Sequence, residues 1–165
     1  MLPETFAAGS SAAQLDREFG GAILAAQQAQ GEVTLSIDPA RIAEVCRFLK
    51  ERLGFNRLSA ITCVDWHPSQ PRFEIIYHLH ALRHEAKRQE RLRLKCRLAE
   101  GQAIDSVYAV WRAADWYERE VFDLFGVEFR NHPNLTRILM PLDWEGHPLR
   151  KDYPVHGYRY SYKDE

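Results

Sequence analysis

The chain has 165 residues, of which 45% are hydrophobic, and its formal net charge at pH 7 is −1. This is the composition of a globular protein of one domain, and the balanced charge argues against a general electrostatic attraction to nucleic acid or anionic lipid. No apolar run approaches the ~18 residues of a membrane span, and the start lacks the basic stretch and long apolar core of a secretion signal. We therefore expect a protein that is cytosolic or that reaches a membrane only through partners.

The three cysteines argue against a metal centre held by this chain alone. Cys46, Cys63 and Cys96 are widely spaced, and none belongs to a Cys-x-x-Cys pair of the kind found in zinc knuckles and iron–sulfur sites. We expect buried thiols that behave as small apolar side chains in a reducing compartment.

The first part of the chain predicts a short helix followed by two strands. Residues 11–19 carry apolar side chains at helical spacing. Residues 22–28 are rich in alanine, which favours a helix, but glycines bracket them as turns bracket a strand, and we predict a strand. Residues 33–37 alternate apolar and polar side chains, which indicates a half-buried strand.

A longer helix is predicted after Asp38. Asp38 can cap its first turn, and Pro39 suits the first helical position. Apolar side chains then recur at helical spacing until Gly54 ends the pattern. They are Ile42, Val45, Cys46, Leu49 and Leu53.

Three further strands follow this helix. Residues 58–64 form an apolar, β-branched run, and residues 73–79 and 92–98 alternate apolar with polar side chains. Residues 67–71 contain two prolines and predict a turn, and the charged residues 84–89 predict a hairpin connection.

The order of these elements predicts an α+β fold. Such a chain builds a two-layer domain in which helices pack on one face of a mixed or antiparallel β-sheet. We expect the domain to cover residues 1–112, a helix to cover residues 113–126, and an extended, proline-rich C-terminal arm to cover residues 127–165. Alternating tyrosines at residues 158–162 suggest another extended piece near the end.

The helix predicted near residue 115 has a signal at each end. Asp115 is a candidate N-cap, and Glu118, three residues later, can complete a capping box. Gly126 follows the last apolar turn, where a left-handed stop residue belongs. Arg119 and Asp123 can form an ion pair at i, i+4 spacing. The apolar face of this helix is expected to consist of Tyr117, Val121, Leu124 and Phe125.

The predicted arm combines regularly spaced prolines with large apolar side chains. Because proline lacks an amide donor and disfavours helix at the preceding residue, neither a helix nor a central strand fits between them. A segment this apolar must cover its own domain or dock on another chain. The prolines are Pro133, Pro141, Pro148 and Pro154, and the apolar residues are Leu135, Ile138, Leu139, Met140, Leu142, Trp144 and Leu149.

Two polar features of the strands have a structural interpretation that we favour over a functional one. The basic residues at alternate positions from Arg91 to Arg97 share one strand face. The stacking aromatics of a nucleic-acid groove are absent beside them, so we expect a solvated or partner-facing surface. His78 and His80 also share a face, but only His84 lies close by in the sequence, which is too few ligands for a metal.

Polar residues of the arm form the most suggestive functional set. An enzyme would place a histidine and an arginine around an anionic substrate, whereas an interface would pair these charges with a partner at its rim. We favour the interface because the polar groups alternate with bulky apolar anchors. The acidic and basic residues of the preceding helix point in several directions, and no phosphate-binding loop, nucleophile elbow or HExxH motif occurs. The polar set is His132, Arg137, His147, Arg150, Lys151 and Asp152.

Three motifs in this region resemble a known family. Residues 118–127 read EREVFDLFGV, residues 132–139 read HPNLTRIL, and residues 143–154 read DWEGHPLRKDYP. Together they are similar to the signature of the C-type subunits of NADH–quinone oxidoreductase, which are the 30 kDa peripheral-arm subunits of respiratory complex I. The resemblance covers most of the chain from about Leu15 to Pro154.

The resemblance implies a protein that binds no cofactor and performs no chemistry alone. Its complex passes electrons from NADH through FMN and iron–sulfur clusters to a quinone, coupled to ion pumping. The implied partners are other peripheral-arm proteins on the cytoplasmic side of the bacterial inner membrane. They are chiefly the D-type protein of the quinone site, the B-type protein with the terminal cluster, and the I-type protein. The residues expected at the partner interface are Glu118, Arg119, Glu120, Asp123, His132, Pro133, Arg137, Met140, Trp144, His147, Pro148, Arg150, Lys151 and Asp152.

Other assignments stay open on the sequence. Related proteins occur in membrane-bound hydrogenases, F420H2 dehydrogenases and photosynthetic NDH-1 complexes, and the motifs separate these poorly, although residues 147–152 favour the respiratory type. From other classes, the alternatives are a stand-alone enzyme using His132 or His147 and a nucleic-acid adaptor using the basic strand face.

Overall fold

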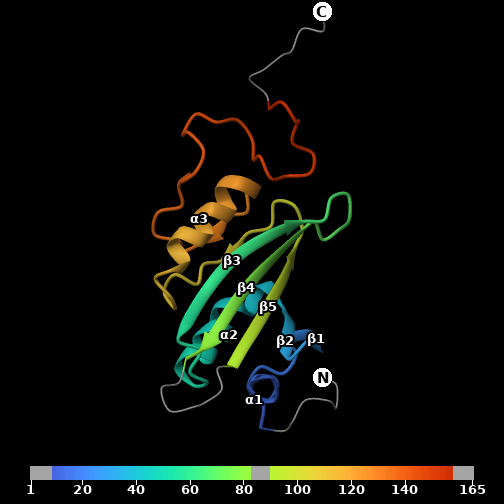
Figure 1. Ribbon diagram of the computed structural model, residues 1–165, viewed down its shortest axis with the longest axis vertical. Helices are drawn as coiled ribbons and strands as arrows, with labels where there is room; N and C mark the ends of the chain where they lie inside the picture. Colours follow the sequence, from blue (N-terminus) through green and yellow to red (C-terminus); the bar gives the residue numbers. More distant parts are fainter. Residues whose placement is uncertain (1–8, 83–89, 158–165) are drawn as a thin grey trace, which may run out of the picture.

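A computed structural model describes residues 9–82 and 90–157, and it places a five-stranded sheet at the centre of the molecule (Figure 1). The strand order is β1-β2-β5-β4-β3. The predicted connection at residues 84–89 and the predicted extended piece at residues 158–162 lie outside the described residues. The strands are β1 (Ile23–Ala29), β2 (Glu32–Ile37), β3 (Arg57–Asp65), β4 (Phe73–Ala81) and β5 (Glu90–Leu98), with a small second sheet of β6 (Ile104–Asp105) and β7 (Phe129–Arg130). The helices are α1 (Ser11–Glu18), the short 3-10 helix η1 (Pro39–Arg41), α2 (Ile42–Glu51) and α3 (Ala114–Phe125).

The predicted α+β fold with a mixed sheet is confirmed. β2 runs parallel to β5, whereas β4 runs antiparallel to both β5 and β3. β1 and β2 form an antiparallel hairpin whose turn residues Gln30 and Gly31 have φ angles of 52° and 76°. Positive φ at both positions matches the twist of a two-residue hairpin. The alanine-rich residues 22–28 therefore form a strand, as predicted, because pairing in the hairpin outweighs the helical preference of alanine.

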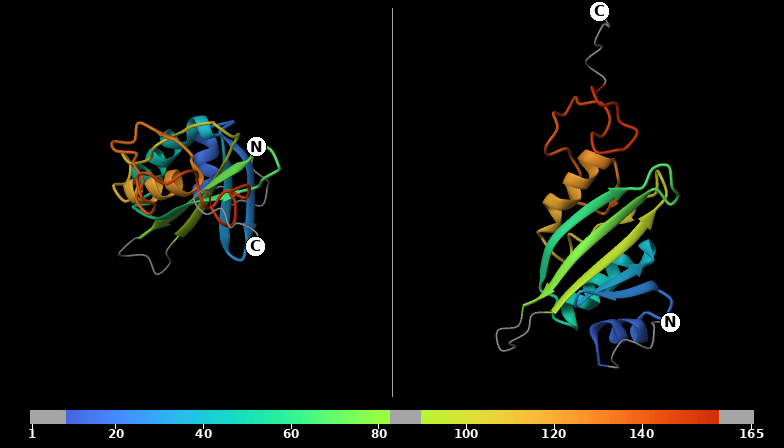
Figure 2. Two further views of the ribbon diagram at one scale, coloured as in Figure 1. Left: turned by 90° about the horizontal axis from the view of Figure 1, so that it is seen from above. Right: turned by 45° about the vertical axis from the view of Figure 1, so that its right-hand side comes forward.

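The core lies between the sheet and the helices behind it. In Figure 1, α2 lies behind β3, β4 and β5, and α1 lies at the lower end of the molecule; Figure 2 shows the same layers from two further sides. Because alternate side chains of a strand point to opposite faces, the apolar positions of β4 and β5 face this core and the polar ones face away. The buried side chains at the centre include Val45, Leu49, Ile75, Tyr77, Leu94 and Cys96.

The helix predicted after Asp38 is present, with a modified start. The Asp38 side chain accepts a hydrogen bond from the Ala40 amide at 3.0 Å, but the turn that it caps is η1, and α2 begins only at Ile42. Gly54 follows with a φ of 76°, as a stop residue requires.

One edge of the sheet is covered by α3. This helix packs beside β3, and the Tyr117 hydroxyl donates a hydrogen bond to the Ser59 carbonyl of that strand at 2.8 Å. The other edge is β1. The predicted apolar face of α3 is confirmed, since Val121 and Phe125 are buried and Tyr117 and Leu124 pack against the core.

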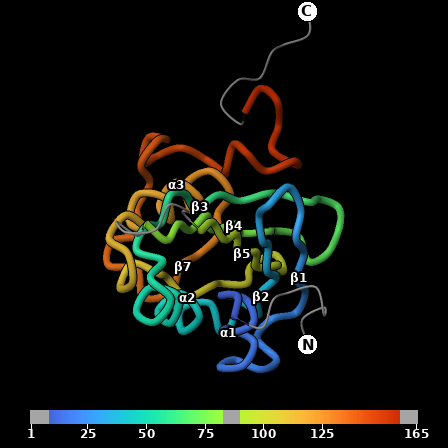
Figure 3. The backbone as a smooth tube through the Cα atoms, turned by 60° about the horizontal axis from the view of Figure 1, so that its bottom comes forward, coloured from blue at the N-terminus to red at the C-terminus, as the bar shows by residue number. Residues whose placement is uncertain are grey.

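Residues 131–157, called the C-terminal segment below, contain no helix or strand. They do not extend away from the domain as an arm but fold back over α3 and the end of the sheet, opposite α1 (Figures 1 and 3). The preceding residues 127–130 include β7, which pairs with β6. The predicted division of the chain into three units, with boundaries after residues 112 and 126, stays a prediction.

Candidate functional site

The first half of α3 is fixed by a buried carboxylate rather than by a cap. The helix begins at Ala114 without a side-chain cap, so the predicted N-cap at Asp115 is wrong. Glu118 does not reach back along the helix either. Its carboxylate accepts hydrogen bonds from the Ser106 hydroxyl at 2.5 Å and the Val107 amide at 2.7 Å, and it is fully buried. The predicted capping box therefore gives way to a contact that ties α3 to the preceding loop.

Burial raises the pKa of Glu118 to about 7, although the two hydrogen bonds act in the opposite direction. The folded protein then keeps a proton that the unfolded chain releases above about pH 4.5. Stability is therefore expected to fall as pH rises from about 4.5 to about 7, by roughly 3 kcal/mol from this group alone.

Replacing Glu118 with glutamine is expected to remove this part of the pH dependence. Glutamine keeps the shape and an acceptor for the Val107 amide but does not titrate. The free energy of unfolding, measured by urea denaturation at pH 5 and pH 8, should fall more steeply for the wild type than for Glu118→Gln. Glu120→Gln, an exposed change on the same helix, is the control and should behave as the wild type. An equal decline in all three proteins would contradict the assignment.

His132 lies in the same buried region. Its side chain is fully buried, and Nε2 lies 3.5 Å from Asp115 Oδ1 and 3.9 Å from Glu118 Oε2. Nδ1 accepts a hydrogen bond from the Asn134 amide at 3.1 Å, so the ring proton is on Nε2 and faces the two carboxylates. His132 thus joins the start of the C-terminal segment to the first half of α3.

The last turn of α3 is capped by the C-terminal segment. The final carbonyls of a helix have no partners within it. Here the Asp123 carbonyl accepts a hydrogen bond from His147 Nδ1 at 2.9 Å, the Leu124 carbonyl from the Leu149 amide at 3.0 Å, and the Phe125 carbonyl from Arg150 Nε at 2.6 Å. The segment therefore completes the helix on which it lies.

Gly126 makes this close approach possible. Its φ of 72° confirms the predicted left-handed stop, and a Cβ at this position would lie 2.5 Å from His147 Nε2 and 2.6 Å from Arg150 Nη2. A side chain here is excluded twice, by backbone conformation and by contact.

Gly126→Ala is expected to destabilise the protein by about 1–2 kcal/mol through the left-handed backbone alone, and to displace His147 and Arg150 from the helix end. Limited proteolysis should then cleave the C-terminal segment faster than in the wild type. Gly101→Ala is the matched control, because that glycine also has a φ of 76° but has nothing near its Cβ position. Equal cleavage of the two variants would show that the contacts with His147 and Arg150 do not hold the segment.

The Asp123 carboxylate binds the middle of the C-terminal segment. It is fully buried, and its Oδ2 accepts hydrogen bonds from the amides of Ile138, Leu139 and Met140 at 2.8–2.9 Å. Its Oδ1 lies 2.6 Å from Arg137 Nη1. Although burial opposes it, this set of donors lowers the pKa of Asp123. The predicted Arg119–Asp123 pair is therefore wrong: Arg119 instead donates to the carbonyls of Thr136 and Arg137, both at 3.1 Å.

The end of the segment is held at the sheet by a buried arginine. Arg72, between β3 and β4, is 2% exposed and forms two hydrogen bonds with Asp65, at 2.8 and 2.9 Å. Its guanidinium also contacts Glu100 at 3.0 Å and Asp152 at 2.5 Å. The second oxygen of Asp65 accepts a hydrogen bond from the Lys151 amide at 2.9 Å. Despite burial, the Arg72 guanidinium and the amides of Lys151 and His67 hold the pKa of Asp65 well below its usual range.

Polar contacts thus hold the C-terminal segment, and four of its aliphatic side chains remain in solvent. Leu139, Leu142, Leu149 and Val155 are 56%, 85%, 51% and 96% exposed. Four large aliphatic side chains exposed along one ordered segment favour an interaction site over singly scattered surface positions. We call these four residues the apolar surface of the segment.

The residues predicted for a partner interface differ in their surroundings. Glu118, Asp123 and the ring of His132 are buried inside this chain, and Arg119, Arg137, His147, Arg150 and Asp152 bind its own carbonyls or charges, as described above. Glu120, Pro133 and Lys151 are exposed, and Met140, Trp144 and Pro148 are half-buried. Whether these side chains contact a partner stays a prediction.

The structure does not bring the two histidines of the enzyme hypothesis together. His132 contacts the first half of α3 and His147 its last turn. Arg137 is occupied by Asp123 and by the Gly146 carbonyl, and Arg150 by the Phe125 carbonyl and Glu100. Within residues 9–82 and 90–157, no group of three or more His, Cys, Asp or Glu could hold a metal ion. No described helix is long and apolar enough to cross a membrane.

Sequence comparison places this arrangement in a family. A family model described as the respiratory-chain NADH dehydrogenase 30 kDa subunit matches residues 35–159. The chain belongs to this family. The resemblance of the α3 and C-terminal motifs to the C-type proteins of complex I is thereby confirmed, and the matched region includes both α3 and the apolar surface.

Curated relatives agree with the family assignment. The C-type subunit of NADH-quinone oxidoreductase from Citrifermentans bemidjiense is 45% identical over 145 residues, which cover 87% of this chain and 88% of the relative. Its counterpart from Geobacter sulfurreducens is 45% identical over 146 residues, with the same two coverages. A counterpart from Rhizobium meliloti is 46% identical over 143 residues, which cover 86% of this chain and 76% of the relative.

Proposed function

We propose that this chain is a cofactor-free structural subunit in the peripheral arm of a proton-pumping NADH:quinone oxidoreductase. In this role it braces the D-type protein of the quinone site and the B-type protein with the terminal iron–sulfur cluster, with the I-type protein nearby, on the cytoplasmic side of the bacterial inner membrane. FMN, iron–sulfur clusters and quinone belong to the other members of the complex. Family membership supports the assembly, and the observation that carries the bracing role is the apolar surface on an ordered C-terminal segment.

Hydrogen bonds within this chain order the C-terminal segment. Asp123, Arg72 and the end of α3 fix the segment through hydrogen bonds, so its conformation does not depend on burying Leu139, Leu142, Leu149 or Val155. A preordered surface of this kind loses little conformational entropy on docking, which favours affinity. Burying an exposed leucine contributes about 1.5–3 kcal/mol.

The test is recovery of companion proteins by the tagged chain from its own cells. Leu139→Ser combined with Leu142→Ser should reduce recovery of the companions by about tenfold or more, since two buried contacts are lost. The matched control is Leu24→Ser, because Leu24 is 66% exposed on β1, away from the segment. The control should recover the companions at wild-type level.

Mass identification of the companions decides between related complexes. Members of an NADH:quinone oxidoreductase support the proposal, whereas members of a membrane-bound hydrogenase, an F420H2 dehydrogenase or a photosynthetic NDH-1 complex would reassign it. The purified chain should contain neither flavin nor iron and should not oxidise NADH; steady NADH turnover by the chain alone would overturn the proposal.

A further inference from the structure

The face of the sheet that points away from α2 carries a second surface. It is formed by the polar positions of β2, β4 and β5, and within the described residues no helix covers it (Figure 1). Its basic side chains outnumber its acidic ones, so this face is positive although the whole chain has a net charge of −1. The basic residues are Arg91, Arg93, Lys95 and Arg97, and the acidic residues are Glu32 and Glu74.

Two cross-strand pairs place basic groups directly opposite each other. In the register of β4 and β5, His78 lies opposite Arg93 and His80 opposite Arg91. If the rings are protonated, these pairs set like charges opposite each other, which destabilises a sheet. By contrast, the other two cations of the face are satisfied locally: Lys95 pairs with Glu74 at 3.2 Å, and Arg97 donates to the Pro71 carbonyl at 2.6 Å.

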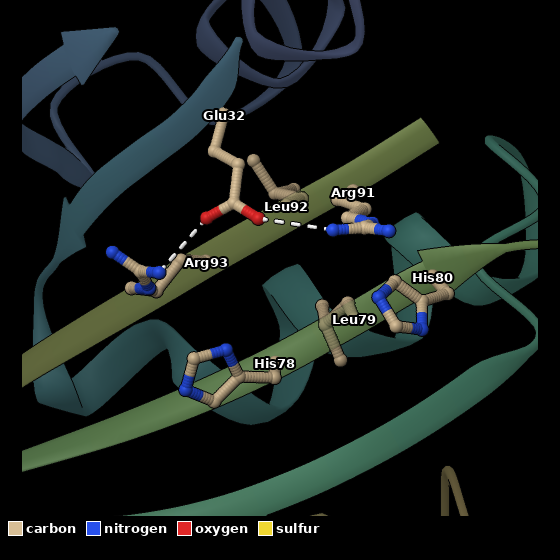
Figure 4. Close-up of a pocket in the computed structure, with 7 residues that line it drawn as sticks. All are labelled: Glu32, His78, Leu79, His80, Arg91, Leu92 and Arg93. Carbon is tan, nitrogen blue, oxygen red and sulfur yellow. Dashed lines mark hydrogen bonds and ion pairs between the residues drawn. The ribbon is translucent and has the colours of Figure 1, made fainter. Parts of the chain in front are cut away.

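The carboxylate of Glu32 pairs with both Arg91 and Arg93. Glu32 lies 2.9 Å from Arg93 and 3.5 Å from Arg91, and it reaches them from β2 across β5 (Figure 4). These side chains, with both histidines, line a surface hollow above the buried Leu79 and Leu92. A guanidinium has five N–H donors, and Arg91 is 62% exposed. The hollow therefore retains donors for another acceptor, and Glu32 shows that its geometry suits a carboxylate.

The two imidazoles respond to the same surroundings. Burial lowers the pKa of both rings. Arg93 lowers that of His78 further, and Arg91 and Arg57 lower that of His80 further, whereas Glu32 opposes the shift weakly in both. His80 contacts the Ser59 hydroxyl at 2.8 Å, whereas in the described part of the chain no hydrogen-bond partner contacts the His78 ring. A second carboxylate in the hollow would favour protonation of both rings.

We propose that this hollow binds an acidic segment of a neighbouring protein in the complex, with an Asp or Glu carboxylate held by Arg91 and Arg93 beside His78 and His80. The inference rests on the proposed function for the identity of the neighbour, but not for the chemistry of the site. An acidic peptide fits better than a lipid surface, because the excess of positive charge is confined to this face and the chain as a whole, with a net charge of −1, does not attract an anionic membrane.

The probe is a hexaglutamate peptide added to the purified chain, with the ring signals of His78 and His80 followed by NMR. Both signals should shift saturably, and binding should weaken with added salt. Binding should also be tighter at about pH 6 than at about pH 8, because protonation of the two rings adds positive charge beside Arg91, Arg93 and Arg57 and offsets Glu32.

Two variants with opposite expected effects on peptide affinity test the role of the residues that line the hollow. Arg91→Gln with Arg93→Gln should weaken binding by about tenfold or more, whereas Glu32→Gln should strengthen it by about threefold, because it removes the negative charge that competes for both guanidiniums. Arg47→Gln with Arg52→Gln, two exposed arginines on and just after α2, makes the same change in net charge elsewhere and should bind as the wild type. If the double variant at the hollow fails to fold, Glu32→Gln alone decides the matter.

Several outcomes would overturn the inference. They are the absence of peptide binding, equal binding by the Arg47/Arg52 control and the hollow variant, equal shifts with inorganic phosphate, or shifts with phosphatidylglycerol vesicles but not with the peptide. Companion recovery through the C-terminal segment is measured separately. Failure of the wild-type chain to recover any member of such a complex, with peptide binding intact, would refute the proposed function and leave the binding site standing.

Discussion

Arg72→Ala is expected to lower the free energy of unfolding by about 3–5 kcal/mol, because it leaves the fully buried Asp65 without its counter-charge. The same guanidinium joins Glu100 and Asp152 to this carboxylate, so the end of the C-terminal segment should also detach. Urea denaturation measures the first effect and amide exchange at Lys151 the second.

Two controls separate this buried cluster from an ordinary surface ion pair. Arg41→Ala breaks an exposed pair with Glu44 and should cost well under about 1 kcal/mol. Arg72→Met combined with Asp65→Asn removes both charges and should be more stable than Arg72→Ala, because no unpaired charge stays buried. A loss below about 1 kcal/mol in Arg72→Ala would contradict the role given to this arginine.

Asp123→Ala is expected to release the C-terminal segment while the sheet stays folded. The carboxylate accepts three backbone hydrogen bonds and pairs with Arg137, and bonds to a charged group contribute about 1.5–3 kcal/mol each. Amides of Ile138, Leu139 and Met140 should therefore exchange about a hundredfold faster, and companion recovery should fall as for the leucine variants.

Asp123→Asn and Glu120→Ala complete this experiment. Asparagine keeps one acceptor oxygen but no charge, so its effect should lie between those of the wild type and alanine. Glu120 is exposed on the same helix, and its replacement should leave the exchange rates unchanged. Unchanged protection of Leu139 in Asp123→Ala would mean that the segment is ordered by other contacts.

Local patterns predicted most of the fold but not the ends of its elements. Strict alternation of apolar and polar residues buries one face of β5, and apolar residues at helical spacing bury one face of α2. Residues 92–98 and the helix after Asp38 could therefore be predicted. The start of α3 could not. Glu118 finds its partners at Ser106 and Val107 in a loop that only the tertiary structure brings close.

The candidate site was predicted in part. Prolines and large apolar residues marked the C-terminal segment as a docking element, and its histidines and arginines stood out as a polar set. Arg72, Asp65 and Glu100 were missed as its anchors, because Arg72 and Asp152 are 80 residues apart in the chain. The available signal was an aspartate and an arginine on the two sides of the predicted turn at residues 67–71, next to the apolar residues Val64 and Phe73, where a charge is otherwise costly.

The manner in which Asp123 holds the C-terminal segment affects how this surface can change among related proteins. Its carboxylate binds the main-chain amides of residues 138–140, a donor that nineteen of the twenty amino acids supply equally. At residues 138–140 the path of the chain therefore depends on main-chain groups rather than on the side chains displayed there. The side chains of these three residues can be exchanged to suit a different neighbour while the hydrogen bonds to Asp123 stay in place, and proline is the one replacement that this arrangement forbids.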